Sequence, residues 1–352
     1  MKKAIKTVVI ILAAALLIVL IGAWAMFGTE FMAANSVEKL TENFYSMEYK
    51  GDYGLDKFIE QGGASDETEL ANYIVEFLSR GFYKPEPKKT SYGCSTLCVN
   101  SPEGGMMFGR NFDWQRCTAM VIRTKPKNGY ASISTSNLDF LGFGNGWLPE
   151  GMSNQFMSLA ALYVPLDGMN EKGLCIADLV IDDGTLTNQN TEKPDLTTTS
   201  AIRLILDKAA TVDEAIELLN QYDMHSSAGM QHHLSIADES GRAVVVEYVD
   251  NKMCVTETNA VTNFYLTDGV KYGIGSEQSH KRYDTLNMIY ADCNGVMTGS
   301  ELMDAMSAVS KHNYPDDGET TEWSVVFDTK NKTARYCRCE NYGIYYDFEI
   351  LK

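Results

Sequence analysis

The hydrophobic and polar positions first set apart the N-terminal end of the chain. Residues 7–29 contain no charged side chain and follow three lysines within the first six residues. A helix of this length can span about 30 Å of hydrocarbon, and basic residues on its short N-terminal side place the rest of the chain outside the cell. Residues 23–25, Ala-Trp-Ala, also have the form of a signal-peptide cleavage site. We therefore expect residues 1–30 to be a transmembrane anchor or a signal peptide.

Residues 31–93 have the pattern of a small helical segment. Asp66 is followed three residues later by Glu69, a helix-start signal, and then by apolar residues at helical spacing, from Leu70 to Leu78. The stretch Lys84–Lys89 contains two prolines and three lysines, which cannot continue a helix. This stretch is either a plain linker or the end of a pro-segment that stops at a processing site. We predict a helical pro-segment over 31–93.

From residue 94 onwards the pattern changes to paired β-strands with helices between them. Three pairs of short β-type runs flank turn residues, which is typical of hairpins: 94–99 with 106–111, 231–237 with 243–249, and 323–328 with 333–338. Helical stretches are predicted over 201–209, 212–219 and 281–290, and another begins at Thr298. Hairpins, then helices, then further hairpins indicate a layered α+β domain over 94–352 rather than a parallel βαβ sheet.

Composition and charge exclude several classes of function. The 30 basic residues against 47 acidic ones give a formal net charge of −17, which argues against nucleic acid as a partner. The eight cysteines are too sparse for a disulfide-stapled scaffold and contain no CxxC pair. Neighbouring His232 and His233 would point to opposite faces of a strand, so they cannot bind one metal ion together. We expect no metal site and no cofactor, and we interpret both histidines as structural, with backbone partners.

The remaining chemistry centres on one cysteine. Walker A, HExxH and GxSxG sequences are absent, whereas Tyr92-Gly93-Cys94 leads into Gly109-Arg110-Asn111-Phe112-Asp113-Trp114. If the two strands pair, Arg110 and Asp113 return to the end that carries Cys94. A nearby guanidinium favours the thiolate, which is the nucleophilic form of cysteine. Cys98 and Cys175 lie in apolar runs and are interpreted as core thiols.

These residues resemble the N-terminal-nucleophile (Ntn) cysteine hydrolases of the choloylglycine hydrolase, penicillin V acylase and acid-ceramidase-like superfamily of linear amide C–N hydrolases. In that family an Arg and an Asp follow the Cys by 16 and 19 positions inside a G-R-N-x-D-W motif, as Arg110 and Asp113 do here. Four further segments resemble family motifs in family order: Met169–Leu174, His233–Glu247, Val261–Asn263 and Ser279–Tyr283.

The resemblance implies a four-layer αββα sandwich and a hydrolase of linear, non-peptide amides that acts on a small N-acyl amide. It implies Cys94 as nucleophile, with its own α-amine as base once the Gly93–Cys94 bond is cleaved. Asn263 and a backbone N–H near Val180 would stabilise the oxyanion. Asp113 would orient the amine, and Arg110 and Arg282 would favour the thiolate.

Two departures from the family pattern leave alternatives open. Cys94 follows 93 residues, so a free amine requires processing at Gly93–Cys94. The segment Ala177-Asp178-Leu179-Val180 replaces a common A-G-L-N, which puts bile-salt specificity in doubt. Acyl transfer through the same thioester and a non-catalytic membrane-tethered binding module are the alternatives to an exported amidase. The sequence does not disclose the acyl group or the oligomeric state.

Overall fold

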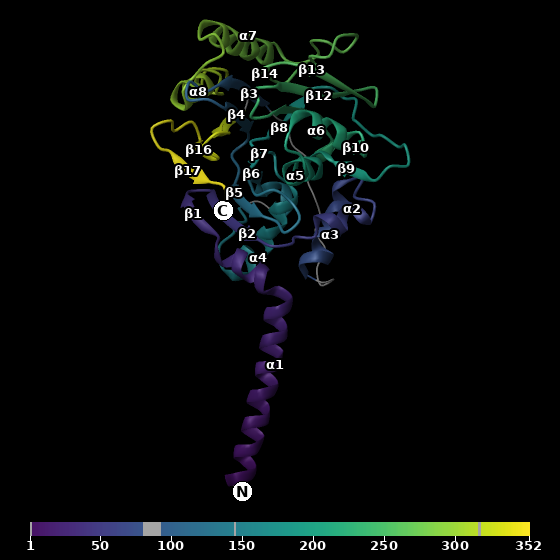
Figure 1. The fold of residues 1–352 in the computed structure, drawn as a ribbon, viewed down its shortest axis with the longest axis vertical. Coiled ribbons are helices and arrows are strands. Elements are labelled where there is room, and N and C mark those ends of the chain that lie inside the picture. The colour runs from purple at the N-terminus through teal and green to yellow at the C-terminus, as the bar shows by residue number, and fades with distance from the viewer. Residues whose placement is uncertain (1, 80–92, 144–145, 316–317) are drawn as a thin grey trace.

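The computed structural model describes residues 2–79, 93–143, 146–315 and 318–352. Helix α1 (Lys2–Asn35) projects from the folded body as one long rod (Figure 1). Its portion Ala15–Asn35 has a mean hydropathy of 1.9 and is long enough to cross a membrane, a test that N-terminal signal sequences also pass. The C-terminal end of the helix packs on the body, where Ala33 and Ala34 are buried.

The segment after α1 differs from the helical expectation, because it also forms strands. Ahead of α2 (Leu55–Glu60) and α3 (Glu67–Ser79), the chain forms β1 (Glu38–Thr41) and β2 (Phe44–Lys50). In β2, aromatic residues are buried on both faces, with Phe44 in the core between the sheets and Tyr45 and Tyr49 in the core under the helices, a pattern that suits a strand between two layers. β2 pairs in parallel with β5 (Ala119–Lys125) and so extends the main sheet.

The predicted start of α3 is confirmed, and the boundary predicted after α3 lies outside the described residues. Asp66 Oδ1 accepts the N–H groups of Thr68 and Glu69 at 2.8 and 2.9 Å, which satisfies two donors of the first turn. The stretch Lys84–Lys89 lies outside the described residues.

Two large sheets form the centre of the molecule, as far as the structure describes the chain. Sheet I has the strand order β1-β2-β5-β6-β7-β8-β11-β12-β13, and sheet II has the order β14-β3-β4-β15-β16-β17. β9 (Asp195–Thr197) and β10 (Asp223–His225) form a small parallel pair. The other strands of sheet I are β6 (Ser132–Asn137), β7 (Asp167–Asn170), β8 (Cys175–Ile181), β11 (Gln231–Ala237), β12 (Ala243–Val249) and β13 (Lys252–Glu257), and those of sheet II are β3 (Gly93–Asn100), β4 (Met106–Trp114), β14 (Ala260–Val261), β15 (Thr320–Asp328), β16 (Thr333–Arg338) and β17 (Tyr346–Glu349).

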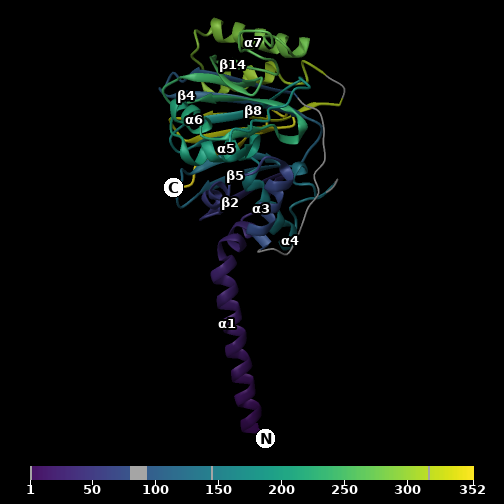
Figure 2. The same ribbon diagram turned by 90° about the vertical axis from the view of Figure 1, so that its right-hand side faces the viewer.

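Helices cover the outer faces of both sheets, so the layers run helix, sheet, sheet, helix (Figure 2). Alternate side chains of β8 separate two cores: Ile176 packs toward the helices, and Ala177 and Leu179 pack between the sheets. The helices on sheet I include α5 (Thr198–Lys208) and α6 (Val212–Leu219), those on sheet II are α7 (Glu277–Asp292) and α8 (Gly299–Ala308), and short helices are η1 (Leu138–Leu141), α4 (Met152–Met157), η2 (Ser158–Tyr163) and η3 (Ser227–Gly229).

The sequence-based elements of this domain are largely confirmed. All three predicted hairpins form antiparallel pairs, namely β3 with β4, β11 with β12 and β15 with β16. The predicted helices correspond to α5, α6, α7 and α8, and α8 begins with a capping box between Thr298 and Glu301. The domain is therefore an α+β sandwich.

Candidate active site

The β3–β4 hairpin places Cys94 at the start of β3, facing the core between the sheets. Gly93 lies opposite Asp113 and Thr96 lies opposite Arg110. Because side chains alternate along a strand, Arg110 shares a face with Cys94, whereas Asp113 points to the other face, toward α7. The hairpin therefore brings Arg110 and Asp113 to Cys94 from opposite faces of sheet II.

The Arg110 guanidinium lies beside the Cys94 thiol and is wholly buried. Its Nε pairs with Asp167 Oδ2 at 2.9 Å, its Nη2 donates to the Asp178 carbonyl at 2.9 Å, and its Nη1 donates to the Asn111 carbonyl. Burial raises the pKa of the Cys94 thiol, and Arg110 opposes that rise without cancelling it. Arg110 is thus a fixed cation that favours the thiolate in an otherwise unfavourable environment.

Arg282 approaches Cys94 from α7, on the other face of the sheet. Its Nη1 donates to the Cys94 carbonyl at 2.6 Å and pairs with Asp113 Oδ2 at 3.2 Å. Its Nη2 donates to Asn263 Oδ1 at 2.7 Å. One buried guanidinium therefore contacts the Cys94 backbone, the Asp113 carboxylate and the Asn263 amide, and fixes their relative positions.

Asn263 bridges the two sheets at Cys94. Its Oδ1 accepts the backbone N–H of Cys94 at 2.7 Å, and its Nδ2 donates to the Val180 carbonyl at 2.7 Å. The Asn263 backbone is held in turn by Ser279 Oγ at 2.6 Å. The contact with Val180 is made through its carbonyl, whereas the sequence analysis named a backbone N–H there. The structure thus brings all five predicted side chains, Gly93 and Val180 to one place.

Asp113 is shared between Arg282 and a residue that sequence reasoning missed. Thr321 lies opposite it in β15, and Thr321 Oγ1 donates to Asp113 Oδ1 at 2.6 Å. With one oxygen on a cation and one on a hydroxyl, the buried carboxylate has two fixed partners.

A cavity of about 30 Å³ adjoins Cys94. This volume holds only a few water molecules at most, so the described conformation has little room for a substrate. Aromatic and aliphatic side chains form one part of its wall, and polar side chains form the other. The lining residues are Cys94, Phe112, Trp114, Phe140, Leu166, Asp178, Val180, Thr199, Ser227, Ala228, Met230 and His232.

Asp178 and His232 form a buried pair in this cavity wall. His232 Nδ1 lies 2.7 Å from Asp178 Oδ1, and His232 Nε2 lies 2.9 Å from the Ser227 carbonyl. Burial lowers the pKa of His232, but Asp178 and the carbonyl outweigh it and leave the pKa raised. The expected backbone partner of His232 is present, and the charged partner was not predicted. The substitution of a common glycine by Asp178 was the sequence signal for it.

His233 points to the other face of β11, as the alternation required. Its Nδ1 lies 2.9 Å from Glu247 Oε1. Among the described residues, no group of three or more His, Cys, Asp or Glu side chains is arranged to hold a metal ion.

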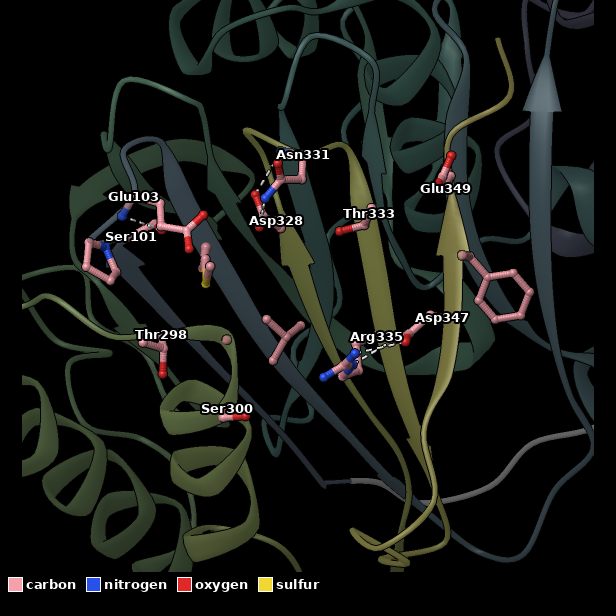
Figure 3. Close-up of a pocket in the computed structure, with 15 residues that line it drawn as sticks. Ser101, Glu103, Thr298, Ser300, Asp328, Asn331, Thr333, Arg335, Asp347 and Glu349 are labelled. Atoms are coloured by element: carbon pink, nitrogen blue, oxygen red, sulfur yellow. Dashed lines mark hydrogen bonds and ion pairs between the residues drawn. The ribbon is translucent and has the colours of Figure 1, made fainter.

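A larger groove, of about 540 Å³, lies far from Cys94. Figure 3 shows it between the start of α8 and strands β15 to β17, with Ser101 and Glu103 of the β3–β4 turn at one side and the Arg335–Asp347 ion pair at the other. Ser101 is seven residues beyond Cys94, or roughly 23 Å along a strand. The groove therefore does not belong to the site at Cys94.

Comparison with known proteins decides the family. Residues 94–298 match the linear amide C–N hydrolases of the choloylglycine hydrolase family. This chain belongs to that family. Penicillin V acylase from Pectobacterium atrosepticum is 33% identical over 99 residues, which cover 25% of this chain and 26% of that relative.

Solved structures support the same fold for this choloylglycine hydrolase family member. A cysteine-to-alanine mutant of the conjugated bile acid hydrolase from Clostridium perfringens superposes with a TM-score of 0.55 at 16% identity, covering 73% of this chain and 92% of that one. An arginine-to-leucine variant of the same hydrolase gives a TM-score of 0.53 at 15% identity, with the same coverage. The α+β sandwich is thus an Ntn-hydrolase-like fold.

Proposed function

We propose that the protein is an exported cysteine amidase that hydrolyses a linear, non-peptide amide through a thioester on Cys94. The observation that carries the proposal is the hydrogen bond from the Cys94 backbone nitrogen to Asn263 Oδ1, within the network of Arg282 and Asp113. This nitrogen becomes the α-amine when Gly93–Cys94 is cleaved. An α-amine with a pKa of about 7.7–8.0 can accept a thiol proton near neutral pH.

The reaction would begin with attack of the Cys94 thiolate on the amide carbonyl. The oxyanion would lie against Asn263 Nδ2 and a backbone N–H near Val180. An amide nitrogen carries two hydrogens, so Asn263 can keep its bond to the Val180 carbonyl and still donate one to the oxyanion. The amine then leaves with a proton, and water hydrolyses the thioester to release the acid and regenerate the thiol.

The surroundings of Cys94 support a small N-acyl amide as substrate. The aromatic part of the cavity wall suits an apolar acyl group, while Asp178 and His232 add a polar part that departs from the family's common A-G-L-N. A neighbouring carboxylate disfavours anionic substrates, so conjugates with an acidic amine are less suitable than neutral ones.

The N-terminal part of the proposal assigns 1–30 to export, 31–93 to a pro-segment and 94–352 to the catalytic domain. The apolar length of α1 supports either a retained anchor or a signal peptide. In both cases the catalytic domain lies outside the cytoplasm, at the cell membrane or secreted.

Intact-mass measurement of the purified protein tests the proposal. We expect two fragments, the larger beginning at Cys94, together with hydrolysis of at least one member of a panel of N-acyl amides. The Cys94→Ala variant should remain uncut and inactive. Hydrolysis by uncut Cys94→Ala protein would refute the nucleophile assignment. Transfer of the acyl group to added hydroxylamine in preference to water would favour the acyltransferase alternative.

A further inference from the structure

A second buried ion pair lies behind the Gly93–Cys94 peptide, on the face of sheet II that carries Asp113. Lys311, which follows α8, is only 3% exposed. Its Nζ pairs with Glu319 Oε2 at 2.8 Å and donates to Gln278 Oε1 at 2.6 Å. Lysine is almost never buried to this extent unless it is paired. The family motifs do not include Lys311 or Glu319, so their position needs an explanation from what they contact.

The pair contacts Gly93, the residue before the bond that processing would break. A Cβ atom at position 93 would lie 2.8 Å from Lys311 Cε and 3.0 Å from both Lys311 Nζ and Glu319 Oε2. Because Glu319 and Gln278 hold the lysine nitrogen, the lysine cannot swing aside freely. Lys311 and Glu319 therefore form a wall that fits a glycine, and they place a cation beside the residue whose carbonyl would be attacked.

The backbone of Lys311 is tied to the same network as the nucleophile. The Lys311 N–H donates to Thr321 Oγ1 at 2.9 Å, and that hydroxyl donates to Asp113 Oδ1 at 2.6 Å. Asp113 in turn pairs with Arg282, which binds the Cys94 carbonyl. Lys311 is thus held in a fixed position relative to the Gly93–Cys94 bond.

We propose that Lys311 is a residue for processing of the precursor, and that Glu319 positions it. Its cation stabilises the negative charge that develops on the Gly93 carbonyl oxygen during cleavage. This inference rests on the proposed cleavage at Gly93–Cys94. Buried, pre-positioned charges are effective here because they need no reorganisation when the new charge appears.

The step it assists is an N-to-S acyl shift followed by hydrolysis. Cys94 Sγ bonds to the Gly93 carbonyl carbon, the Gly93–Cys94 C–N bond breaks, and the thiol proton moves to the departing nitrogen to give a free amine. Water then adds to the thioester: its hydroxyl stays on Gly93 as the carboxyl group, and its other proton returns to Sγ. One water is consumed and Cys94 is left as a new N-terminus.

Three variants of the full-length protein separate an electrostatic role from a structural one: Lys311→Met, Glu319→Gln, and the double variant. Processing is followed over time by intact mass. Lys311→Met should slow cleavage by about 10²-fold, the size of effect seen when one oxyanion donor is removed. Glu319→Gln removes the counter-charge but keeps an amide oxygen that can accept from Lys311 Nζ and hold it in place, so this variant should cleave at least as fast as the wild type. Lys271→Met, which removes the lysine paired with Asp183 elsewhere, should leave cleavage unchanged.

The double variant serves as the folding control, because it removes both charges of the Lys311–Glu319 pair together. We expect it to melt close to the wild type yet cleave as slowly as Lys311→Met. Amide hydrolysis per cleaved molecule should stay near the wild-type value in all three variants.

The outcomes distinguish this inference from the function on which it rests. Equal slowing by Lys311→Met and Glu319→Gln would mean that the pair is a structural clamp, and wild-type cleavage in Lys311→Met would also overturn the proposal. An uncut wild-type protein would instead refute the proposed processing itself.

Discussion

Cys94 and Cys98 lie on the same face of β3, are equally buried at 2% exposed, and pack into the same core between the sheets. Their surroundings differ in charge and in the contacts to the backbone. Around Cys98, burial alone raises the pKa of the thiol, whereas around Cys94 the Arg110 cation opposes the rise. The other groups at Cys94 bind its backbone: Asn263 accepts from its nitrogen and Arg282 donates to its carbonyl.

This comparison shows that depth in the core does not distinguish the two thiols, whereas the neighbouring charge does. A thiol that contacts only apolar neighbours stays protonated and inert, as the position of Cys98 implies. At Cys94 the Arg110 cation favours the thiolate against burial and the nearby carboxylates, and the backbone contacts hold the peptide that processing would cut.

The largest effect is expected from Arg110→Met, which should make Cys94 resemble Cys98. It leaves Asp167 buried without its cation, which typically costs about 3–5 kcal/mol of stability, and it should raise the pKa of the Cys94 thiol further. Urea unfolding and the pH dependence of Cys94 alkylation measure the two effects. Arg203→Met is the control, because it breaks another fully buried pair, with Asp207 at 2.9 Å. It should destabilise the protein without altering Cys94; an unchanged alkylation profile in Arg110→Met would contradict the assignment.

Asn263→Ala should reduce the turnover rate by about 10²–10³, the cost of losing one oxyanion donor. Steady-state hydrolysis, normalised to the fraction that carries a Cys94 N-terminus, checks this. Asn170→Ala is a matched control: its amide donates to the Leu206 and Ala209 carbonyls in the fold. We expect Asn170→Ala to lower stability and spare the rate. A rate loss no greater in Asn263→Ala than in this control would argue against the oxyanion role.

Asp178→Asn should change how stability depends on pH. Folding raises the pKa of His232 above 6.5, so the pair stabilises the fold fully below about pH 6.5, and that contribution is lost as pH rises through the raised pKa. A hydrogen bond to a charged group contributes about 1.5–3 kcal/mol. Chemical denaturation across pH should therefore show a wild-type advantage over Asp178→Asn that shrinks with rising pH. An advantage that grows instead would mean that His232 is neutral in the fold.

The smallest effect is expected at Cys98. Cys98→Ala removes a buried sulfur that contacts apolar neighbours, so the free energy of unfolding should fall by roughly 1 kcal/mol. Processing and hydrolysis should not change. Denaturation and intact mass test both parts. Loss of processing in Cys98→Ala would remove the distinction between the two thiols.

The sequence predicted the elements of the fold well where the pattern is local. Turn residues between β-type runs predicted all three hairpins, and capping residues predicted the starts of α3 and α8. β1 and β2 escaped prediction because β1 has only four residues and the second partner of β2, β5, is remote in the chain. Pairing of that kind depends on tertiary contacts rather than on local propensity.

The residues of the candidate site also divide into those that local patterns predict and those that they do not. Hairpin geometry predicts that Arg110 and Asp113 return to Cys94, whereas Asn263 and Arg282 are more than 160 positions away from it and were identified only by resemblance to family motifs. Asp167, Lys311 and Glu319 were missed, because in a sequence a buried charge cannot be told from a solvated one. Their roles depend on partners that only the fold supplies.

The parallel pairing of β2 with β5 has a consequence for the fate of a cut chain. Residues 31–79 supply two strands of sheet I and helices that pack on it. Breaking the Gly93–Cys94 bond would therefore cut the polypeptide, but the N-terminal part would stay bound to the domain that begins at Cys94. The mature protein would then be a two-chain assembly held by a shared sheet. If α1 is retained, the enzyme would stay tethered to the membrane through a chain to which it is no longer covalently joined.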